Sequence, residues 1–159
     1  MSERKQIIST GTVCQNRKAR FHYTIIETLD AGIVLEGSEV KSLRMGAANI
    51  SEAYAVEKDG ELYLNNALIT SLGSSGHFKH IEGRARKLLL HKKEMNKLLG
   101  MIARKGYTVV PLEIYFTERG LAKVRLGVAI GKNAADKRET EKKREWNKEK
   151  QRILNYKNR

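Results

Sequence analysis

Three of the four histidines are the first residues to consider for chemistry, because imidazole is a common metal ligand. His77 and His80 are three residues apart, and His91 follows 11 residues after His80. No cysteine or cluster of carboxylates adjoins them, and the surrounding segment is basic. Zinc sites combine histidine with such ligands, so we expect no metal site and no cofactor.

Two other groups of residues could in principle serve catalysis. The glycine-rich sequence LGSSG at 72–76 lacks the lysine and the strand–loop–helix setting of a phosphate-binding loop, and a flexible connection explains it better. Glu36, Glu39 and Glu52 could bind magnesium, but nothing in their spacing brings them together. A residue such as Glu39 is more typically solvated or salt-bridged. We therefore expect no catalytic residue and no enzymatic activity.

The basic residues carry a stronger signal. The chain has 31 Lys and Arg against 18 Asp and Glu, a net charge of +13 and an isoelectric point near 9.9. This balance favours a polyanionic partner, most commonly RNA or DNA. Guanidinium and ammonium groups at this density suit phosphates. The clusters are Arg17, Lys18 and Arg20; Arg84, Arg86, Lys87, Lys92 and Lys93; and Lys123 with Arg125, which alternate on a predicted strand and so share one face.

The elements that must position these clusters read as β-hairpins. FHYTIIETL and Ile33–Leu35 are separated by a plausible turn at Asp30–Gly32. Asp59-Gly60, between AYAVEK and ELYLN, predicts a type I′ turn. YTVVPLEIYF and LAKVRLGVAI form a third hairpin, in which Pro111 indicates an edge position or a bulge.

Two helices accompany the strands. EVKSLRMG, preceded by Ser38 as a possible cap and stopped by Gly46, predicts a short one. From Lys92 onward the apolar residues Met95, Leu98, Leu99 and Ile102 fall on one helical face. Residues 87–90 could be strand or helix. About six antiparallel strands and two helices favour a small, closed or nearly closed barrel, mainly β. A small basic barrel without a recognition helix favours RNA over duplex DNA.

The last 29 residues, 131–159, differ from the body at 1–130. They carry 11 Lys and Arg against 5 Asp and Glu, and their large apolar residues are Trp146, Ile153, Leu154 and Tyr156. Charge pairs at helical spacing, such as Glu139 with Lys143, support a helix, but no continuous apolar stripe accompanies them. We expect a tail that is disordered when free and helical on a partner.

The single cysteine, Cys14, indicates a reducing compartment. The N-terminal sequence lacks the apolar region of a signal peptide, and no run approaches the length of a membrane span. These features predict a cytoplasmic protein without a membrane partner.

Four segments in order resemble the SmpB family of bacterial tmRNA-binding (SsrA-binding) proteins. They are GIVLEGSEVKSLRMGAANISEAY, RARKLLLHKKE, KGYTVVPLEIYF and KVRLGVAIGKNAADKRE, and the resemblance extends from about Asn16 to the end. It implies an oligonucleotide-binding (OB) barrel with two or three flanking helices and no enzymatic activity. It also implies a trans-translation adapter, a monomer that binds the tRNA-like domain of alanine-charged tmRNA and delivers it to stalled ribosomes.

The resemblance also implies site residues. The tmRNA face would include Asn16 and the basic residues after it, Asp30, the RARKLLLH segment with Leu89 and His91, and Lys123 on the same side. The tail would enter the empty mRNA channel of the small ribosomal subunit and contact its RNA. Its candidate residues are Gly131, Lys132, Asp136, Lys137, Arg138, Lys143, Arg144, Trp146, Lys150 and Arg152. Where many members have a second lysine and a histidine in this region, this chain has Asn133 and Ala135.

Alanyl-tRNA synthetase and elongation factor Tu would then be partners only indirectly, through tmRNA. Two other classes stay open. A ribosome-associated structural RNA-binding protein would co-purify with every ribosome, and an RNA-processing enzyme would cleave or modify RNA by itself.

Overall fold

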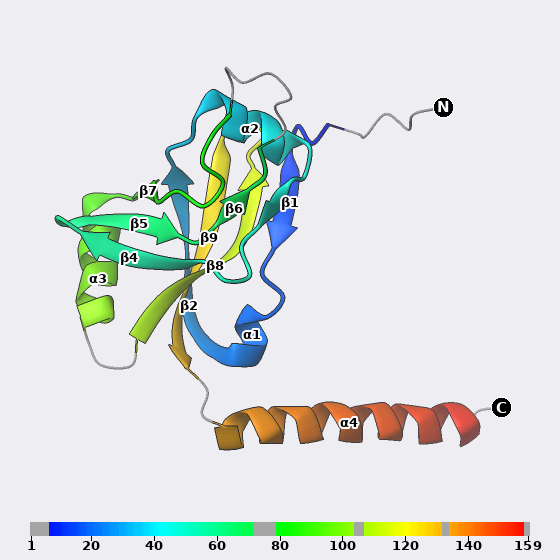
Figure 1. Cartoon of the computed structure of the whole chain (residues 1–159). Helices are drawn as coiled ribbons and strands as arrows, with labels where there is room; N and C mark the ends of the chain where they lie inside the picture. The colour runs from blue at the N-terminus through cyan, green and yellow to red at the C-terminus, as the bar shows by residue number, and fades with distance from the viewer. Residues whose placement is uncertain (1–6, 72–78, 104–106, 132–133, 158–159) are drawn as a thin grey trace, which may run out of the picture.

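The computed structural model describes residues 7–71, 79–103, 107–131 and 134–157, which form nine strands and four helices (Figure 1). The strands are β1 (Gly11–Gln15), β2 (Tyr23–Ile33), β3 (Ala48–Asn49), β4 (Tyr54–Lys58), β5 (Glu61–Asn65), β6 (Leu68–Ile69), β7 (Arg86–Leu89), β8 (Tyr107–Phe116) and β9 (Ala122–Gly131). The helices are α1 (Ala19–His22), α2 (Gly37–Arg44), α3 (Lys92–Ala103) and α4 (Ala134–Lys157). The described strands therefore outnumber the six that the sequence predicts.

Six strands close into an antiparallel barrel. Their order is β8-β4-β5-β7-β2-β9, and pairing of β9 with β8 completes the ring. β1 extends the sheet by pairing with the second half of β8, and β3 with β6 forms a separate two-stranded sheet. The prediction of a small, mainly β barrel is confirmed.

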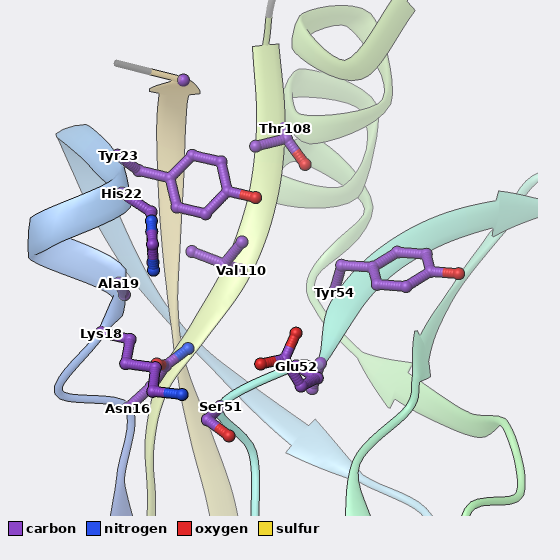
Figure 2. A pocket seen from close by; sticks show the side chains of 12 residues that line it. Asn16, Lys18, Ala19, His22, Tyr23, Ser51, Glu52, Tyr54, Thr108 and Val110 are labelled. Atoms are coloured by element: carbon purple, nitrogen blue, oxygen red, sulfur yellow. The ribbon is translucent and has the colours of Figure 1, made fainter. Parts of the chain in front are cut away.

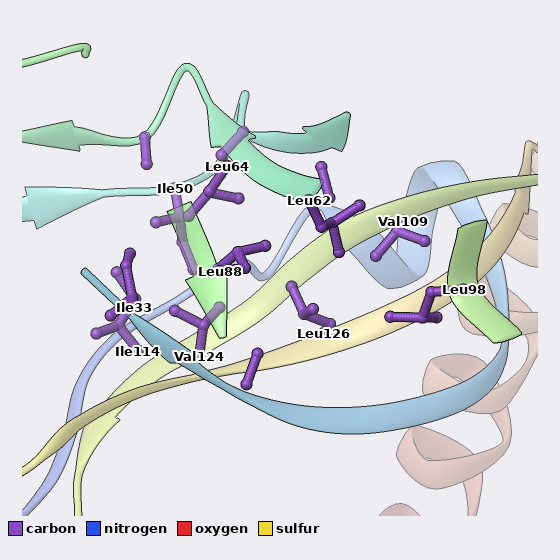
Figure 3. Close-up of a cluster of buried hydrophobic side chains, with 14 of the residues drawn as sticks. Ile33, Ile50, Leu62, Leu64, Leu88, Leu98, Val109, Ile114, Val124 and Leu126 are labelled. Carbon is purple, nitrogen blue, oxygen red and sulfur yellow. The ribbon is translucent and has the colours of Figure 1, made fainter. Parts of the chain in front are cut away.

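Alternation along the strands fills the barrel with apolar side chains. Leu62, Leu64, Leu88, Val109 and Leu126 are at most 1% exposed, and they point into one cluster (Figure 3). The face of α3 with Met95 and Leu98 covers one opening of the barrel, as the helical spacing predicts. The core is thus the product of period-two strands and one amphipathic helix.

Three local predictions are confirmed in detail. Asp59 and Gly60 both have positive φ, 52° and 77°, as a type I′ turn between β4 and β5 requires. The register of β8 against β9 shifts between Pro111 and Glu113, so the proline sits at a bulge. Gly46, with φ of 72°, ends α2.

The turn predicted at Asp30–Gly32 is wrong, because β2 continues through it to Ile33. Asp30, Ala31 and Gly32 pair with Arg125, Val124 and Lys123 of β9. Ala31 is buried, and Gly32 lies against Leu89, where an added Cβ would be 3.2 Å from the Leu89 Cβ. The glycine therefore permits close approach of two strands and not a reversal of the chain.

Other boundaries also differ from the prediction. Residues 86–89 form a strand, which settles the open choice at 87–90. α2 begins at Gly37, and the backbone N–H of Glu36 donates to the Glu39 carboxylate at 2.8 Å, so Ser38 is not the cap. The tail is helical over Ala134–Lys157.

The predicted glycine-rich loop at 72–76, His77 and the predicted helix end at Lys105-Gly106 lie outside the described residues.

Candidate nucleic-acid interface

Three predicted site residues meet on the outer face of neighbouring strands. Gly32 of β2 pairs with Leu89 of β7 on one side and with Lys123 of β9 on the other. Asp30 lies two residues along β2, so its side chain shares their face. Leu89 is 50% exposed and Asp30 is exposed, whereas their neighbours Leu88 and Ala31 face the core. We call Asp30, Leu89 and Lys123 the outer face.

A polar network continues this face across β9, β8 and β1. Asp30 accepts hydrogen bonds from the Tyr115 hydroxyl at 3.0 Å and from Arg125 Nε at 3.4 Å. Arg125 also lies 2.5 Å from Glu113, which accepts a bond from Thr12 through its other oxygen. The network fixes Asp30 and Arg125 in place.

Burial, and then the hydrogen bond to Asp30, raise the pKa of Tyr115, so its hydroxyl remains a neutral donor to that carboxylate. Lys123, in contrast, has no ion pair or hydrogen bond to any side chain that the structure describes. Its ammonium group is therefore available to a phosphate.

Asn16 lies at the junction of β1 and α1 and is 7% exposed. Its Nδ2 donates to the Pro111 carbonyl at 3.0 Å, and its backbone N–H donates to Leu112 at 2.8 Å, so it holds the β8 bulge. Its Oδ1 is buried and accepts no hydrogen bond from the residues described. Arg17, Lys18 and Arg20, which follow, are exposed. Asn16 is thus a structural donor whose acceptor oxygen has no partner among the described residues.

The second basic cluster is divided by the fold. Arg86 is fully buried and is paired with the fully buried Glu39 at 2.5 Å. Its guanidinium also donates to the carbonyls of Ala67 and Glu82, at 2.8 and 3.0 Å. The expectation that Arg86 binds RNA is therefore corrected, because its donors are used inside the protein.

Other members of this cluster stay near the surface. Arg84 contacts the same Glu39 carboxylate but keeps a side chain that is 25% exposed. Lys87 is 3.7 Å from Glu61, and His91 is exposed while its backbone carbonyl accepts the Met95 N–H at the start of α3. Lys87 belongs to the same strand as Leu89, two residues before it, and His91 follows the end of that strand, so both lie at the rim of the outer face.

Two hollows border α1. The first, which we call the aromatic pocket, encloses about 490 Å³ and is shown in Figure 2. Lys18, His22 and Tyr23 form one wall, Ser51, Glu52 and Tyr54 another, and Thr108 and Val110 of β8 lie between them. Aromatic rings beside hydrogen-bonding groups suit an unpaired nucleobase.

The second, which we call the arginine hollow, encloses about 390 Å³. Asn16 lines both hollows, and the arginine hollow is otherwise lined by Gln15, Arg17, Arg20, Leu112, Glu113, Arg125 and Arg144. Through Arg125 it adjoins the outer face. The predicted residues Asn16, Arg17 and Arg20 are thereby connected to Asp30, Leu89 and Lys123.

Alternative chemistries find little support in the described part of the chain. No His, Cys, Asp and Glu residues there group as metal ligands, and no helix there is long and apolar enough to span a membrane. His80 is buried, with its ring nitrogens 2.9 Å from the Ser38 hydroxyl and 2.7 Å from the Ile69 carbonyl. Burial raises the pKa of the Cys14 thiol to about 11, so it is protonated at neutral pH.

Comparison with known proteins decides the family. The model of the SmpB protein family matches residues 13–156. The chain belongs to the SmpB family. The SsrA-binding protein of Gluconacetobacter diazotrophicus is 54% identical over 154 residues, which cover 96% of this chain and 99% of the relative. That of Brucella canis is 49% identical over 154 residues, covering 97% and 98%.

A solved structure supports the same assignment. It is described as "tmRNA-SmpB: a journey to the center of the bacterial ribosome", and its matching chain is 48% identical with a TM-score of 0.67. The match covers 82% of this chain and 93% of the solved one. Fold and sequence therefore agree on the SmpB family.

In this SmpB-family chain the tail candidates are placed by α4. Gly131 ends β9 and lines the aromatic pocket, and Lys132 lies outside the described residues. Asp136, Lys137 and Arg138 lie in the first turns of α4. Lys143, Arg144, Trp146, Lys150 and Arg152 lie further along it with exposed side chains, and the Lys150 ammonium is 5.5 Å from the Trp146 ring centre.

Sequence reasoning missed several residues of the interface. Tyr23 and Tyr54 of the aromatic pocket, and Glu113 and Tyr115 of the polar network, were not candidates. The period-two alternation of β8 could have placed Glu113 and Tyr115 on the outside, opposite Arg125 and Lys123. No pattern in the sequence brings Tyr23 beside residues 51–54.

Proposed function

We propose that this chain is an RNA-binding adapter of trans-translation, which binds the tRNA-like domain of tmRNA and delivers it to stalled ribosomes. The observation that carries this proposal is the continuous surface from Leu89 and Lys123, through Arg125, to Arg17 and Arg20. The family match and the SsrA-binding relatives supply the identity of the RNA.

The surface suits a folded RNA. Lys123 and the arginines offer charge to phosphates, which positions the RNA without reading its sequence. Leu89 offers an apolar contact, and the fixed carboxylate of Asp30 can accept a bond from a ribose hydroxyl or a base amine. The adapter acts by binding and positioning, and we assign it no catalytic step.

The two parts of the chain divide this function. The buried core clusters of the described residues lie between Ala19 and Ala129, which supports a body at 1–130 that binds RNA and a tail at 131–159. The basic tail would take the place of the messenger in the empty mRNA channel. It would become fully ordered only there, so its conformational entropy would be lost only on a ribosome whose mRNA channel is vacant. In that role the adapter is a cytoplasmic monomer, and alanyl-tRNA synthetase and elongation factor Tu meet it only through tmRNA.

Sequencing of the RNA that co-purifies with the tagged full-length protein tests the proposal. We expect tmRNA to dominate, and its share to fall strongly in Lys123→Glu. Lys58→Glu is the matched control, because Lys58 is an exposed lysine of the β4–β5 hairpin that lines neither hollow. If ribosomal RNA co-purifies in equal ratio with the protein and tmRNA does not, the chain is instead a structural protein associated with every ribosome.

A further inference from the structure

The arginine hollow has an unusual concentration of charge. Among the residues that the structure describes, four arginines and one glutamate line it, and together they carry a formal charge of +3. The glutamate, Glu113, is already bonded through both oxygens, to Arg125 and to Thr12. Asp30 and Glu113 offset the charge of Arg125, but the lining as a whole stays positive, and an anion in the hollow would reduce the repulsion between its guanidinium groups. The hollow therefore has the charge and the donors for a phosphate group.

The lining comes from both parts of the chain. Arg17 and Arg20 flank the start of α1, Arg125 belongs to β9, and Arg144 belongs to the tail helix α4. α4 passes the end of the barrel at which α1 lies (Figure 1), and the two helices are in contact. The tail therefore contributes a wall of a site that otherwise belongs to the body.

One contact holds Arg144 at this place. Its guanidinium carbon is 5.9 Å from the ring centre of Phe21 in α1, within the range of a cation–π interaction. Phe21 is partly buried, and such a contact near the surface is weak, of the order of 0.5–1 kcal/mol. It orients Arg144 without fixing α4 permanently on the body.

We propose that the arginine hollow is a binding site for an RNA phosphate that the tail completes through Arg144. The proposal rests on the proposed function for the identity of the RNA. Because coupling between two binding events is reciprocal, a phosphate that binds better with α4 present also holds α4 on the body. α4 then stays on the body while the RNA is bound, and release of α4 from the body breaks one contact with an RNA phosphate.

Fluorescence anisotropy with a labelled tRNA-like RNA, over a series of salt concentrations, tests the site in the full chain. We expect Arg144→Gln to weaken binding about fivefold and to lower the salt slope by about 0.9, the value for one phosphate contact. Lys142→Gln removes the same charge two residues away, on the other side of α4, and should have less than about half this effect. Equal effects of the two variants would overturn the proposal.

A second measurement separates this proposal from the proposed function. Inorganic phosphate is titrated into the ¹⁵N-labelled protein while the arginine Nε–H signals and the anisotropy of Trp146, the chain's single tryptophan, are followed. We expect the signals of Arg17, Arg125 and Arg144 to shift together and Trp146 to become less mobile, and both responses to diminish in Phe21→Leu. If the tRNA-like RNA does not bind but phosphate gives these shifts, the function fails and the site stands. If phosphate shifts none of the arginines, the site fails.

Discussion

Arg86 and Glu39 form an ion pair in which both side chains are fully buried, although 47 residues separate them in the sequence. Burial lowers the pKa of Arg86, and the hydrogen bond and charge of Glu39 oppose this, so the guanidinium stays charged. The remaining donors of Arg86 bond to backbone carbonyls around Ala67 and Glu82. The pair fastens α2 to the strand that carries Leu89.

Loss of Arg86 should therefore destabilise the whole fold. We expect Arg86→Leu to lower the free energy of unfolding by about 3–5 kcal/mol, because the Glu39 carboxylate would be buried without its partner. Lys87→Leu, at the next position of β7, should cost less than about 1 kcal/mol, because its ion pair with Glu61 is exposed. Urea unfolding measures both free energies of unfolding. Equal losses in the two variants would show that the burial of Arg86 does not determine its contribution to stability.

The same pair predicts a dependence of stability on pH. Burial alone would raise the pKa of Glu39, but hydrogen bonds from Arg84, the Glu36 backbone and Arg86 outweigh it and lower the pKa below 4.5. A lowered folded-state pKa gives stability that is present above the unfolded value and is lost as the pH falls through the folded value. We expect the unfolding free energy to fall below about pH 4.5, and Glu39→Gln to reduce that slope. An unchanged slope in Glu39→Gln would assign the acid sensitivity to other carboxylates.

The sequence predicts local features of this protein well and distant pairings poorly. Asp59-Gly60 and Pro111 were recognised because turn and bulge chemistry is local. The Asp30–Gly32 segment contains turn residues, yet it stays in a strand because the barrel needs a residue without a side chain against Leu89. Arg86 was assigned to the surface because its partner lies far away in the chain. Asp30 and Leu89 came from family resemblance, Lys123 also from its place in a basic cluster, and only the strand register explains the proximity of the three.

Asn16 should contribute to both stability and RNA binding. We expect Asn16→Ala to cost about 1 kcal/mol of stability, because the Pro111 carbonyl loses its donor, and to weaken RNA binding further than that loss of folded protein explains. Urea unfolding and RNA titration at a temperature where the variant is fully folded separate the two effects. Unchanged affinity of the folded variant would leave Asn16 with only its structural role.

The body should bind RNA without the tail. A fragment of residues 1–131, which is the body at 1–130 with Gly131 kept because it ends β9, contains the outer face, the aromatic pocket and every wall of the arginine hollow except Arg144. We expect this fragment to bind the tRNA-like RNA no more than about tenfold more weakly than the full chain, with a salt slope lower by about 0.9 for each lost phosphate contact. A fragment that is folded by circular dichroism but binds no RNA would contradict the division into body and tail.

The tail should be needed for a later step, on the ribosome. Triple substitution of Asp136, Lys137 and Arg138 by alanine removes one negative and two positive charges from the first turns of α4. Trp146→Ala removes the largest apolar group of the tail, which is 62% exposed here and could pack only against a partner. We expect both variants to deliver tmRNA to stalled ribosomes and to fail in alanine transfer to the nascent chain.

A reconstituted rescue reaction checks this by scoring alanine transfer on a truncated message and on one that fills the mRNA channel. The wild-type protein should act on the first message and hardly on the second. A message that fills the channel covers the ribosomal RNA that the basic tail would bind, so the tail cannot become ordered there. Lys142→Gln, which removes one positive charge further along α4, serves as the control for loss of charge, and it should retain transfer. Trp146→Ala isolates packing from charge, because it alters neither the net charge nor the arginine hollow. If the tail variants transfer alanine as fast as the wild type on the truncated message, the tail is a solvated extension, and its 24-residue helix has no role in sensing the empty channel.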